Sequence, residues 1–440
     1  MLGYGVRGRT YAKYALTHPL EFEIVAIADP VFKDAQLRTS RSSSLPQPQL
    51  RTSRSSSLPQ TQLQTSRSSS LPFFNLSTFQ PFNFSTSQPS QPYQTFSDWR
   101  EALEVEADAA IISLPDRLHC EAAEAALERG LHILLEKPLG CSWEECERIQ
   151  RAQRRTGRLV LTGYVLRFSA YYRRLKQVLR THVIGDLVSI HHLVAIGYGK
   201  AAHAFCRGNW GREEDGTTAL VQKCSHDFDL IVWWTGKRMP QRIASFGSLM
   251  HWRPECAPRG AALRCVDCPA TVREACPFDA VRLYCDEKDL RYHFPDESDE
   301  AMRRVVETSP YGRCVYHCGN DAVDHQTAIL EYSDGLTVTL EMEAYSKLRR
   351  RCTHFYGTRG VIVCDGEDLI EIKPFVGNDI TIRVTPDEAD GHHGGGDREI
   401  MSEFYRLAAT ASPERFSAIL DAELESHSLA FSAEASRKRQ

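Results

Sequence analysis

Hydrophobic and polar positions alternate in blocks along the chain from residue 97 to residue 164. Continuous apolar runs predict buried strands at 107–114, 131–136 and 158–164. Segments with apolar residues at helical spacing predict helices at 97–105, 117–130 and 142–157. Short buried strands separated by amphipathic helices are typical of a parallel sheet with right-handed crossovers.

The chain begins with a glycine-rich turn, followed by a helical segment and another apolar run. Gly3, Gly5 and Gly8 form the pattern G-x-G-x-x-G, and Asp29 ends the apolar run EIVAIA. Such glycines permit a tight turn, close approach of the backbone to a pyrophosphate, and packing of helix on strand. A carboxylate at Asp29 accepts from a ribose 2′-hydroxyl and repels a 2′-phosphate. The pattern predicts a Rossmann domain that binds NAD, with NADP disfavoured.

One strand of this predicted domain is too short. The central strand should precede Gly3, but only Met1 and Leu2 stand there. We expect either that the recorded start lies downstream of the true one or that the domain has an open slot beside its phosphate loop.

A low-complexity insert interrupts the predicted domain at 36–95. A unit of 13 residues, LRTSRSSSLPQPQ and its near copies, repeats there and is rich in Ser, Gln and Pro. So few packable side chains cannot offset the entropy of ordering, so we interpret the insert as a disordered linker. A kinase-targeted or partner-binding linker is the alternative, since RSSS follows arginine.

Composition narrows the function. The net charge is −4, which lacks the basic excess that attracts nucleic acid or anionic lipid. No apolar run reaches the roughly 18 residues that span a bilayer, and the start has no signal-peptide h-region. Fourteen cysteines are too few for a disulfide scaffold, so most should be free thiols or metal ligands. We expect a cytoplasmic protein.

Polar residues cluster after two of the predicted strands. Pro115, Asp116 and His119 follow one strand, and Glu136 and Lys137 follow the next. Ligands bind at the carboxyl edge of open parallel sheets, so these residues are candidates for a site.

A second candidate group lies in the later part of the chain. Residues 218–236 predict a helix on which Gln222 and His226 are four apart and share a face. An imidazole can accept a hydroxyl proton near neutral pH. Arg207 and Trp210, in the loop before this helix, could bind a sugar ring or an acid, which suggests an anionic or highly hydroxylated substrate.

Together these pieces resemble the Gfo/Idh/MocA oxidoreductases, named after glucose-fructose oxidoreductase and inositol dehydrogenase. The matching motifs are GYGVRG with Asp29, SLPDRLH, LLEKPLG, GYVLRFSAYY and CSHDFD. The resemblance implies an α/β protein with an N-terminal Rossmann domain and a C-terminal α/β domain that has an open, largely antiparallel sheet. It implies NAD(P)-dependent chemistry on the CH–OH groups of sugars, cyclitols or related polyols, and homo-oligomers that form through the C-terminal sheet.

The resemblance also implies roles for single residues. Lys137 and His226 match the catalytic lysine and histidine, and Pro138 matches an often cis proline. Where the family commonly has Asp, this chain has Gln222. The other implied cofactor contacts are Gly3, Gly5, Arg7, Gly8, Asp29, Leu114, Pro115, His119, Glu136 and Arg167. The other implied substrate contacts are Tyr164, Arg167, Trp210 and Lys223. The loop 391–397 resembles a loop near the substrate, and Asp397 could instead cap the following helix.

We place the Rossmann domain at 1–140 and the C-terminal domain at 141–440, with a cysteine-rich insertion at about 253–310. Its cysteines are Cys256, Cys265, Cys268, Cys276 and Cys285, and Cys314 and Cys318 follow. The run C-x2-C-x7-C-P resembles iron–sulfur and zinc motifs. The fit to known motifs is loose, so we assign no metal from the sequence, and buried free thiols are the alternative.

Two other functions remain open at this stage. One is an NAD-dependent glycosidase on the same fold, which would release sugar without net NADH. The other is a non-catalytic NAD-binding regulatory protein. The short first strand, and Gln222 in place of the family's usual Asp, are the two features that favour it.

Overall fold

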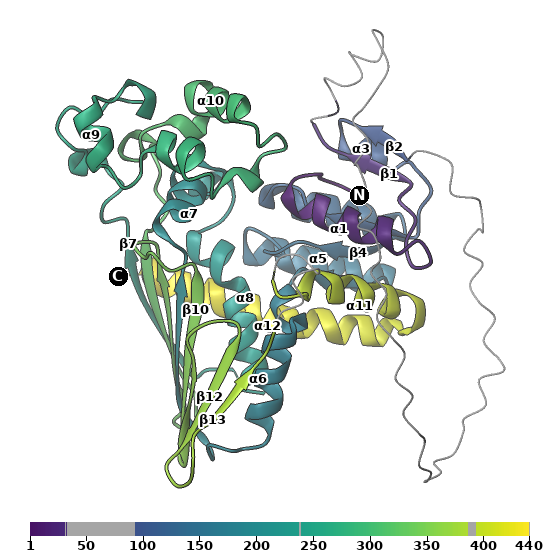
Figure 1. The fold of residues 1–440 in the computed structure, drawn as a ribbon. Helices are drawn as coiled ribbons and strands as arrows, with labels where there is room; N and C mark the ends of the chain where they lie inside the picture. Colours follow the sequence, from purple (N-terminus) through teal and green to yellow (C-terminus); the bar gives the residue numbers. More distant parts are fainter. Residues whose placement is uncertain (31, 33–92, 237–238, 386–392, 440) are drawn as a thin grey trace, which may run out of the picture.

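The computed structural model describes residues 1–30, 32, 93–236, 239–385 and 393–439. Most of the predicted linker, residues 36–92, lies outside these ranges. The described residues form two domains, a parallel sheet with helices and a larger sheet with a helical extension above it (Figure 1). The predicted fold class is confirmed.

The N-terminal domain has the strand arrangement of a dinucleotide-binding sheet. Its strands are β1 (Ala26–Ala28), β2 (Gln94–Phe96), β3 (Ala109–Ile112), β4 (His132–Leu135) and β5 (Val160–Thr162). All neighbouring pairs are parallel, as predicted. Its helices are α1 (Val6–Thr17), α3 (Trp99–Ala102), α4 (His119–Glu128) and α5 (Trp143–Thr156).

The expected open slot is absent from the structure. Leu2 bridges in parallel to both Ala28 of β1 and Ile112 of β3. Its N–H donates to Ile111 O at 2.8 Å, and its carbonyl accepts from Ser113 N at 2.8 Å. Leu2 is 2% exposed. The bonds to β1 come from its neighbours: Ala28 N donates to Met1 O at 2.9 Å, and Gly3 N donates to Ala28 O at 2.8 Å. Residues 1–3 therefore join the two halves of the sheet by backbone hydrogen bonds on both sides.

Two sequence-based boundaries need correction. The insert was predicted to reach residue 95, but Gln94 and Thr95 pair with Ala26 and Ile27 in β2. The Rossmann domain was predicted to end at residue 140, but β5 pairs with β4 and extends the same sheet to Thr162. The first error comes from a strand of three residues, which is too short for a period-2 pattern to show. The second does not: the strand at 158–164 was predicted, but it was placed in the wrong domain.

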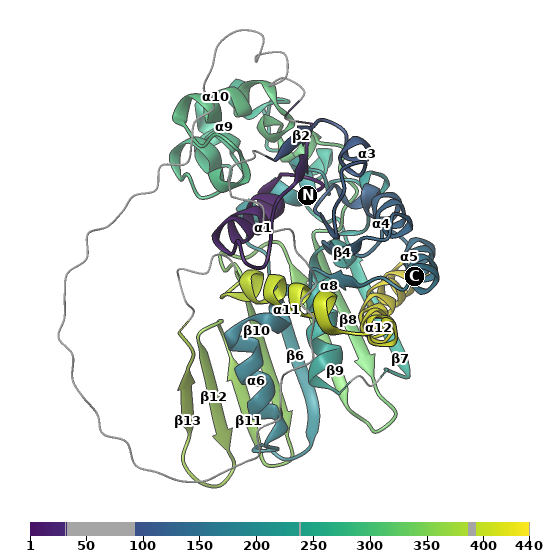
Figure 2. The same cartoon turned by 90° about the vertical axis from the view of Figure 1, so that its right-hand side faces the viewer.

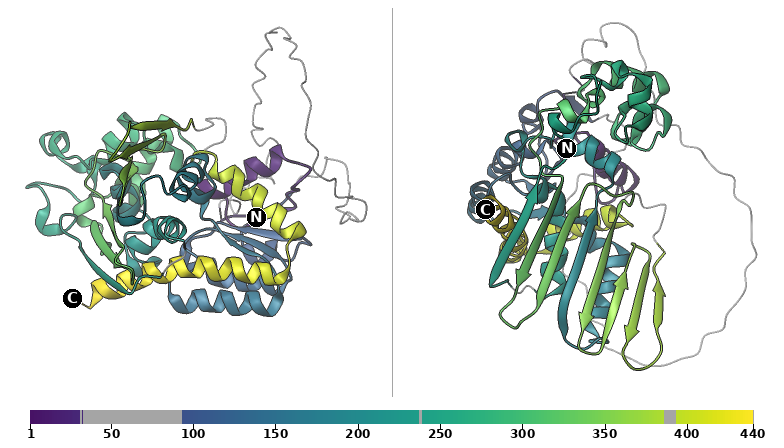
Figure 3. Two further views of the ribbon diagram at one scale, coloured as in Figure 1. Left: turned by 90° about the horizontal axis from the view of Figure 1, so that it is seen from below. Right: turned by 90° about the vertical axis from the view of Figure 1, so that its left-hand side faces the viewer.

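The C-terminal domain contains a sheet whose described strands run in the order β13-β12-β11-β10-β6-β9-β8-β7. Only β6 and β9 are parallel neighbours; the other pairs are antiparallel. The strands are β6 (Leu187–Ala195), β7 (Arg242–Ser248), β8 (His325–Glu331), β9 (Thr337–Glu343), β10 (Arg350–Gly357), β11 (Gly360–Cys364), β12 (Leu369–Pro374) and β13 (Ile380–Arg383). Helices lie on one face of this sheet, the face turned to the viewer in Figure 2, and the right-hand view of Figure 3 shows its other face open.

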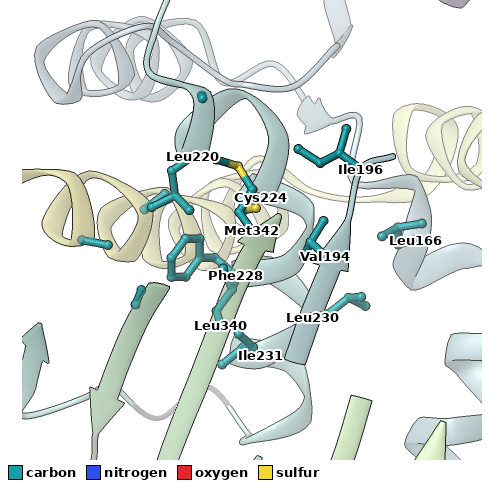
Figure 4. Packing of buried hydrophobic residues seen from close by; sticks show 14 of the residues in the cluster. Leu166, Val194, Ile196, Leu220, Cys224, Phe228, Leu230, Ile231, Leu340 and Met342 are labelled. Carbon is teal, nitrogen blue, oxygen red and sulfur yellow. The ribbon is translucent and has the colours of Figure 1, made fainter. Parts of the chain in front are cut away.

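Helix α8 (Ala219–Trp234) lies over the middle of the sheet. Thr218 caps it by accepting from Val221 N, which explains why it begins there. Its apolar face packs Leu220, Cys224 and Phe228 over Leu340 and Met342 of β9 (Figure 4). This packing fixes the helix that carries His226.

Two C-terminal helices return to the Rossmann domain. Helix α11 (Gly396–Thr410) contacts α1, and α12 (Pro413–Lys438) contacts α5, β5, α8 and β7. Figure 3 shows α12 running along both domains. These contacts hold the two domains in one arrangement around the site between them.

The remaining helices complete the second domain. Helices α6 (Ala170–Arg180) and α7 (Tyr198–Ala202) follow β5 and β6, and α9 (Ala270–Ala275) and α10 (Asp299–Thr308) belong to the cysteine-rich insertion between β7 and β8. Within the described ranges, no helix combines the length and apolar character needed to cross a bilayer.

Candidate active site

The glycine-rich loop has the shape that a dinucleotide requires. A Cβ on Gly3 would lie 2.5 Å from Ser113 O, and one on Gly8 would lie 2.2 Å from Gly3 O, so both positions need glycine. A Cβ on Gly5 would meet nothing within 4 Å, so this residue borders open space. Gly5 caps α1 without a side-chain bond, which leaves the first N–H groups of the helix available to a pyrophosphate. The loop therefore fits the predicted cofactor.

Asp29 stands beside this loop at the end of β1. Its Oδ2 accepts a hydrogen bond from Tyr4 N at 2.7 Å. The bond holds the carboxylate next to the glycine turn, where the adenosine ribose of a dinucleotide lies in this fold.

A buried ionic network joins the loop to the end of β4. Arg7 Nε donates to Glu136 Oε1 at 2.6 Å, and Arg7 Nη2 lies 2.8 Å from Asp397 Oδ1. Tyr11 donates to the same Glu136 oxygen at 2.6 Å. Burial alone raises the pKa of Glu136, but Arg7 and Tyr11 outweigh it and lower that pKa. Glu136 is therefore a carboxylate, and Arg7 bridges it to Asp397 of α11.

Lys137 follows Glu136 and points toward the second domain. Its Nζ donates to the backbone carbonyl of Gln222 at 2.7 Å, and its peptide bond to Pro138 is cis, as the resemblance implied. Burial lowers the pKa of Lys137, while Asp116 and Glu136 oppose that shift. A lysine with a lowered pKa releases and regains a proton more readily than an ordinary one.

His119 supports the strand end that carries Lys137. Its two ring nitrogens lie 2.7 Å from Pro138 O and 2.9 Å from Leu114 O. The ring is 1% exposed. His119 therefore ties the two segments together, and it is a structural bridge behind the predicted cofactor contacts Leu114 and Pro115.

His226 lies on α8 and is 8% exposed. Its Nδ1 has no hydrogen-bond partner among the described residues. Burial, with the charges of Lys137 and Arg351, holds its pKa well below the usual value. His226 is therefore neutral near pH 7 and can accept a proton. The rings of Tyr164 and His393 lie 6.0 and 6.2 Å from it, between centroids.

The predicted pair Tyr164 and Arg167 is held by internal bonds. The Tyr164 hydroxyl bonds to His427 of α12, and Arg167 Nε donates to Asp229 Oδ2 at 2.6 Å. Tyr164 is 2% exposed. The structure thus gives both residues contacts that position α8 and α12, while the Arg167 side chain keeps 22% of its surface exposed.

Trp210 forms a wall of the site opposite Lys137. Its Nε1 donates to Asp116 Oδ2 at 2.9 Å, and the Lys137 ammonium lies 5.9 Å from its ring centroid. Arg207, three residues earlier, instead turns into the cysteine-rich insertion.

Further cations surround Lys137, and sequence reasoning found only one of them. Burial lowers the pKa of Lys223 to about 8 and that of Lys200 to about 7, and each lysine also feels the charge of Lys137. Neither forms an ion pair in the described part of the chain. Arg351, by contrast, is paired with Asp227. Lys200 and Arg351 lie on separate elements and carry no motif, so nothing in the sequence points to them, whereas His393 lies in the loop 391–397 that the resemblance had placed near the substrate.

Two family models match this chain. The model described as "Oxidoreductase family, NAD-binding Rossmann fold" matches residues 83–164. The model described as "Oxidoreductase family, C-terminal alpha/beta domain" matches residues 176–435. The second match alone covers more than half of the chain.

Individual proteins are similar over different spans. The putative oxidoreductase YteT of Bacillus subtilis is 23% identical over 68% of this chain and 72% of its own. Inositol 2-dehydrogenase 1 of Saccharopolyspora erythraea is 36% identical over 29% of this chain, which is 34% of that protein.

Solved structures share the fold. Scyllo-inositol dehydrogenase from Lactobacillus casei, with bound NAD(H) and scyllo-inositol, has a TM-score of 0.57 and 15% identity, and the match covers 100% of this chain and 96% of the other. Levoglucosan dehydrogenase with NADH and levoglucosan has a TM-score of 0.58 and 15% identity, and the match covers 98% of this chain and 96% of the other.

Proposed function

This chain belongs to the Gfo/Idh/MocA family of oxidoreductases, and from that premise we propose that it oxidises a secondary alcohol of a sugar-like or cyclitol-like polyol. NAD is the cofactor of its Rossmann domain. The observation that carries the proposal is the meeting of Lys137, from the cofactor domain, with α8, which carries the neutral His226. An alcohol placed there has a cationic donor and a proton acceptor on neighbouring elements.

The cofactor is held by the loop and strand ends already described. Gly5 and the N-terminus of α1 face its pyrophosphate, and Asp29 binds the adenosine ribose. When bound, the nicotinamide supplies the acceptor for a hydride. Glu136 stays ionised and fixes the neighbouring Lys137.

Two side chains manage the proton of the alcohol. His226 accepts it through a ring nitrogen, because burial keeps the imidazole neutral at working pH. The Lys137 ammonium stabilises negative charge that develops on the carbinol oxygen. Gln222 contributes through its backbone carbonyl, which anchors Lys137, so the site functions without the aspartate that is common at this position.

Charge indicates which polyols fit best. Lys200 and Lys223 are partly buried, lie near Lys137 and have no ion pair among the described residues. The Lys200 ammonium bonds to His293, and the carboxylates of Asp289 and Asp227 act on Lys200 and Lys223 from beyond ion-pair distance. Partly buried ammonium groups without a carboxylate in direct contact favour an anionic ligand. We therefore propose a carboxylated substrate, such as a uronic or aldonic acid, as the preferred class.

Matched pairs of substrates test this function. Purified protein with NAD is offered glucose with glucuronate, galactose with galacturonate, and myo-inositol, and NADH absorbance is followed. We expect NADH to form, with at least tenfold higher kcat/KM for the acid of each pair. Preference for the neutral member would reject the anionic class. Release of sugar from the methyl glycosides of the same sugars and acids, without NADH, would support the glycosidase function instead.

We also propose assembly through the C-terminal sheet. The outer face of the sheet presents Phe246 of β7 and Ile329 of β8, which are 57% and 43% exposed. The helices lie on the opposite face. A second copy would cover this face, and light scattering of Phe246→Glu against wild type tests the assembly.

The cysteines support a reducing, cytoplasmic compartment as a further part of the proposal. None of the fourteen forms a disulfide in the structure. Oxidising compartments favour disulfides, so fourteen unpaired cysteines fit the cytoplasm better.

A further inference from the structure

The insertion between β7 and β8 has little regular structure to hold it together. Its described α-helices are α9 and α10, of 6 and 10 residues, joined by short 3-10 and π turns. A small cluster of its own lies at its centre: Cys265, Ala280, Leu283, Tyr284, Leu290, Ala301, Met302 and Val306. Small units of this kind usually need a disulfide or a metal to fold stably. The cysteines here form no disulfide.

Four of its cysteines line one cavity. They are Cys265, Cys268, Cys276 and Cys314. Much of the remaining wall is apolar: Pro258, Ala261, Val272, Phe278, Val315 and Tyr316. Two of the five cysteines grouped in the sequence analysis, Cys256 and Cys285, do not line the cavity. The fourth cysteine of the cavity is Cys314, which follows Cys276 by 38 residues.

Each of the four sulfurs faces an N–H group. Ala262 N donates to Cys268 Sγ at 3.2 Å, and Arg207 Nη2 donates to Cys265 Sγ at 3.5 Å. The backbone N–H groups of Phe278 and Tyr316 face Cys276 and Cys314. N–H donors around cysteine sulfurs stabilise metal-bound thiolates.

Arg207 supplies a buried positive charge to the same cavity. The residue is 4% exposed, and its other bonds go to the carbonyls of Arg313 and Phe278. Its Nη1 has no partner in the described part of the chain. The carboxylate that lines the same cavity, Asp279, pairs with Arg273 at 3.4 Å, and no ion pair between a carboxylate and Arg207 occurs among the described residues. A buried guanidinium without a counter-charge is costly, and an anionic centre held by thiolates would neutralise it.

The spacing of the thiols distinguishes between metals. A tetrahedral zinc site with Zn–S bonds of about 2.3 Å brings its sulfurs to about 3.8 Å from one another and leaves no void. Here the sulfurs border a cavity of about 10 Å³. No three His, Cys, Asp or Glu side chains of the described residues come close enough to hold a single ion. A multi-iron cluster needs wider spacing than a single ion.

We propose that Cys265, Cys268, Cys276 and Cys314 ligate a [4Fe–4S] cluster. The cluster holds the insertion against the segment that carries Arg207, and three residues further on Trp210 forms the wall beside Lys137. Its role is therefore to fix a substrate-binding wall. The cofactor loop lies on the other domain and is independent of it.

Metal analysis of the full chain, purified without oxygen, tests the proposal. We expect about four irons and four acid-labile sulfides per chain, a broad visible absorbance that dithionite bleaches, and an electron paramagnetic resonance signal in the reduced protein. Stoichiometric zinc without sulfide, or protein free of both metals after iron–sulfide reconstitution, would overturn it.

Cysteine variants locate the cluster. Cys265→Ser and Cys314→Ser should lose most of the iron, while Cys285→Ser, in the same insertion but outside the cavity, should retain it. NAD affinity should change less than threefold in all three variants. Full iron content in Cys314→Ser would contradict the ligand set, and the wild-type iron and sulfide content decides the proposal even if a ligand variant fails to fold.

Discussion

The cofactor side and the substrate side of the site are built differently. On the cofactor side, Gly3, Gly5, Gly8 and Asp29 recognise their ligand through backbone shape and one carboxylate. On the substrate side, partly or fully buried lysines and a histidine from separate elements carry shifted pKa values. A backbone loop can bind its ligand in contact with water. Proton transfer, by contrast, uses side chains whose pKa values are shifted because they are removed from water. The two sides should therefore respond differently to mutation and to pH.

The largest expected effect separates binding from chemistry at Lys137. Lys137→Ala should lower kcat by about a thousandfold, within the range typical of a lost acid–base group, and leave NAD affinity within a few fold. Steady-state kinetics and calorimetry measure the two effects. Lys176→Ala is the control, because Lys176 also binds a backbone carbonyl of α8, that of Trp234 at 3.2 Å, at the far end of the helix. If NAD affinity fell as far as kcat, Lys137 would act in cofactor binding, and the proposed difference between the two sides of the site would be wrong.

His226→Ala should lower kcat by about a hundredfold near pH 7, with partial recovery at high pH, where hydroxide takes over the proton. Because the pKa of His226 lies well below its usual value, wild-type kcat should not fall between pH 8 and pH 6 through protonation of this ring. His132→Ala, a histidine in β4, is the control. Unchanged kcat in His226→Ala would remove this residue from the mechanism.

Asp29→Ala tests the cofactor side alone. NAD affinity should fall about tenfold, equivalent to about 1.4 kcal/mol, and the preference over NADP should disappear because the repulsion of the 2′-phosphate is lost. Calorimetry with both dinucleotides measures this, and Asp98→Ala is the surface control. Tighter binding of NADP than NAD by the wild type would contradict the role of Asp29.

The smallest effect is a pH dependence that only acidic substrates show. Below pKa values of about 7 and 8, Lys200 and Lys223 carry charge, and above them they are neutral. The kcat/KM for a uronic acid should therefore fall several-fold from pH 6.5 to pH 9, while that for its neutral sugar stays flat. Lys223→Met should flatten the acid's profile, and Lys13→Met should not. Parallel profiles for acid and sugar would show that these lysines do not bind the substrate.

The sequence could place the candidate cofactor residues because each group of them forms a short local pattern along the chain. The loop at 3–8 and the strand ends at 29 and 136–138 are local patterns that a parallel sheet brings to one edge. Lys200 and Arg351 could not be predicted, since only tertiary packing brings α7 and β10 together at the site, while His393 was anticipated only through its loop, 391–397. The role of Leu2 was also missed, because a strand of two residues has no periodicity to detect.

Following the hydrogen on the reacting carbon shows whether the polyol passes a hydride to the nicotinamide of NAD. The panel member that reduces NAD fastest is prepared with deuterium at that carbon, and the cofactor is analysed by mass spectrometry after one turnover. The account predicts deuterium at C4 of the reduced nicotinamide and a slower rate than with the unlabelled polyol. Deuterium recovered in solvent, or returned to a sugar product while NAD stays oxidised, would contradict it.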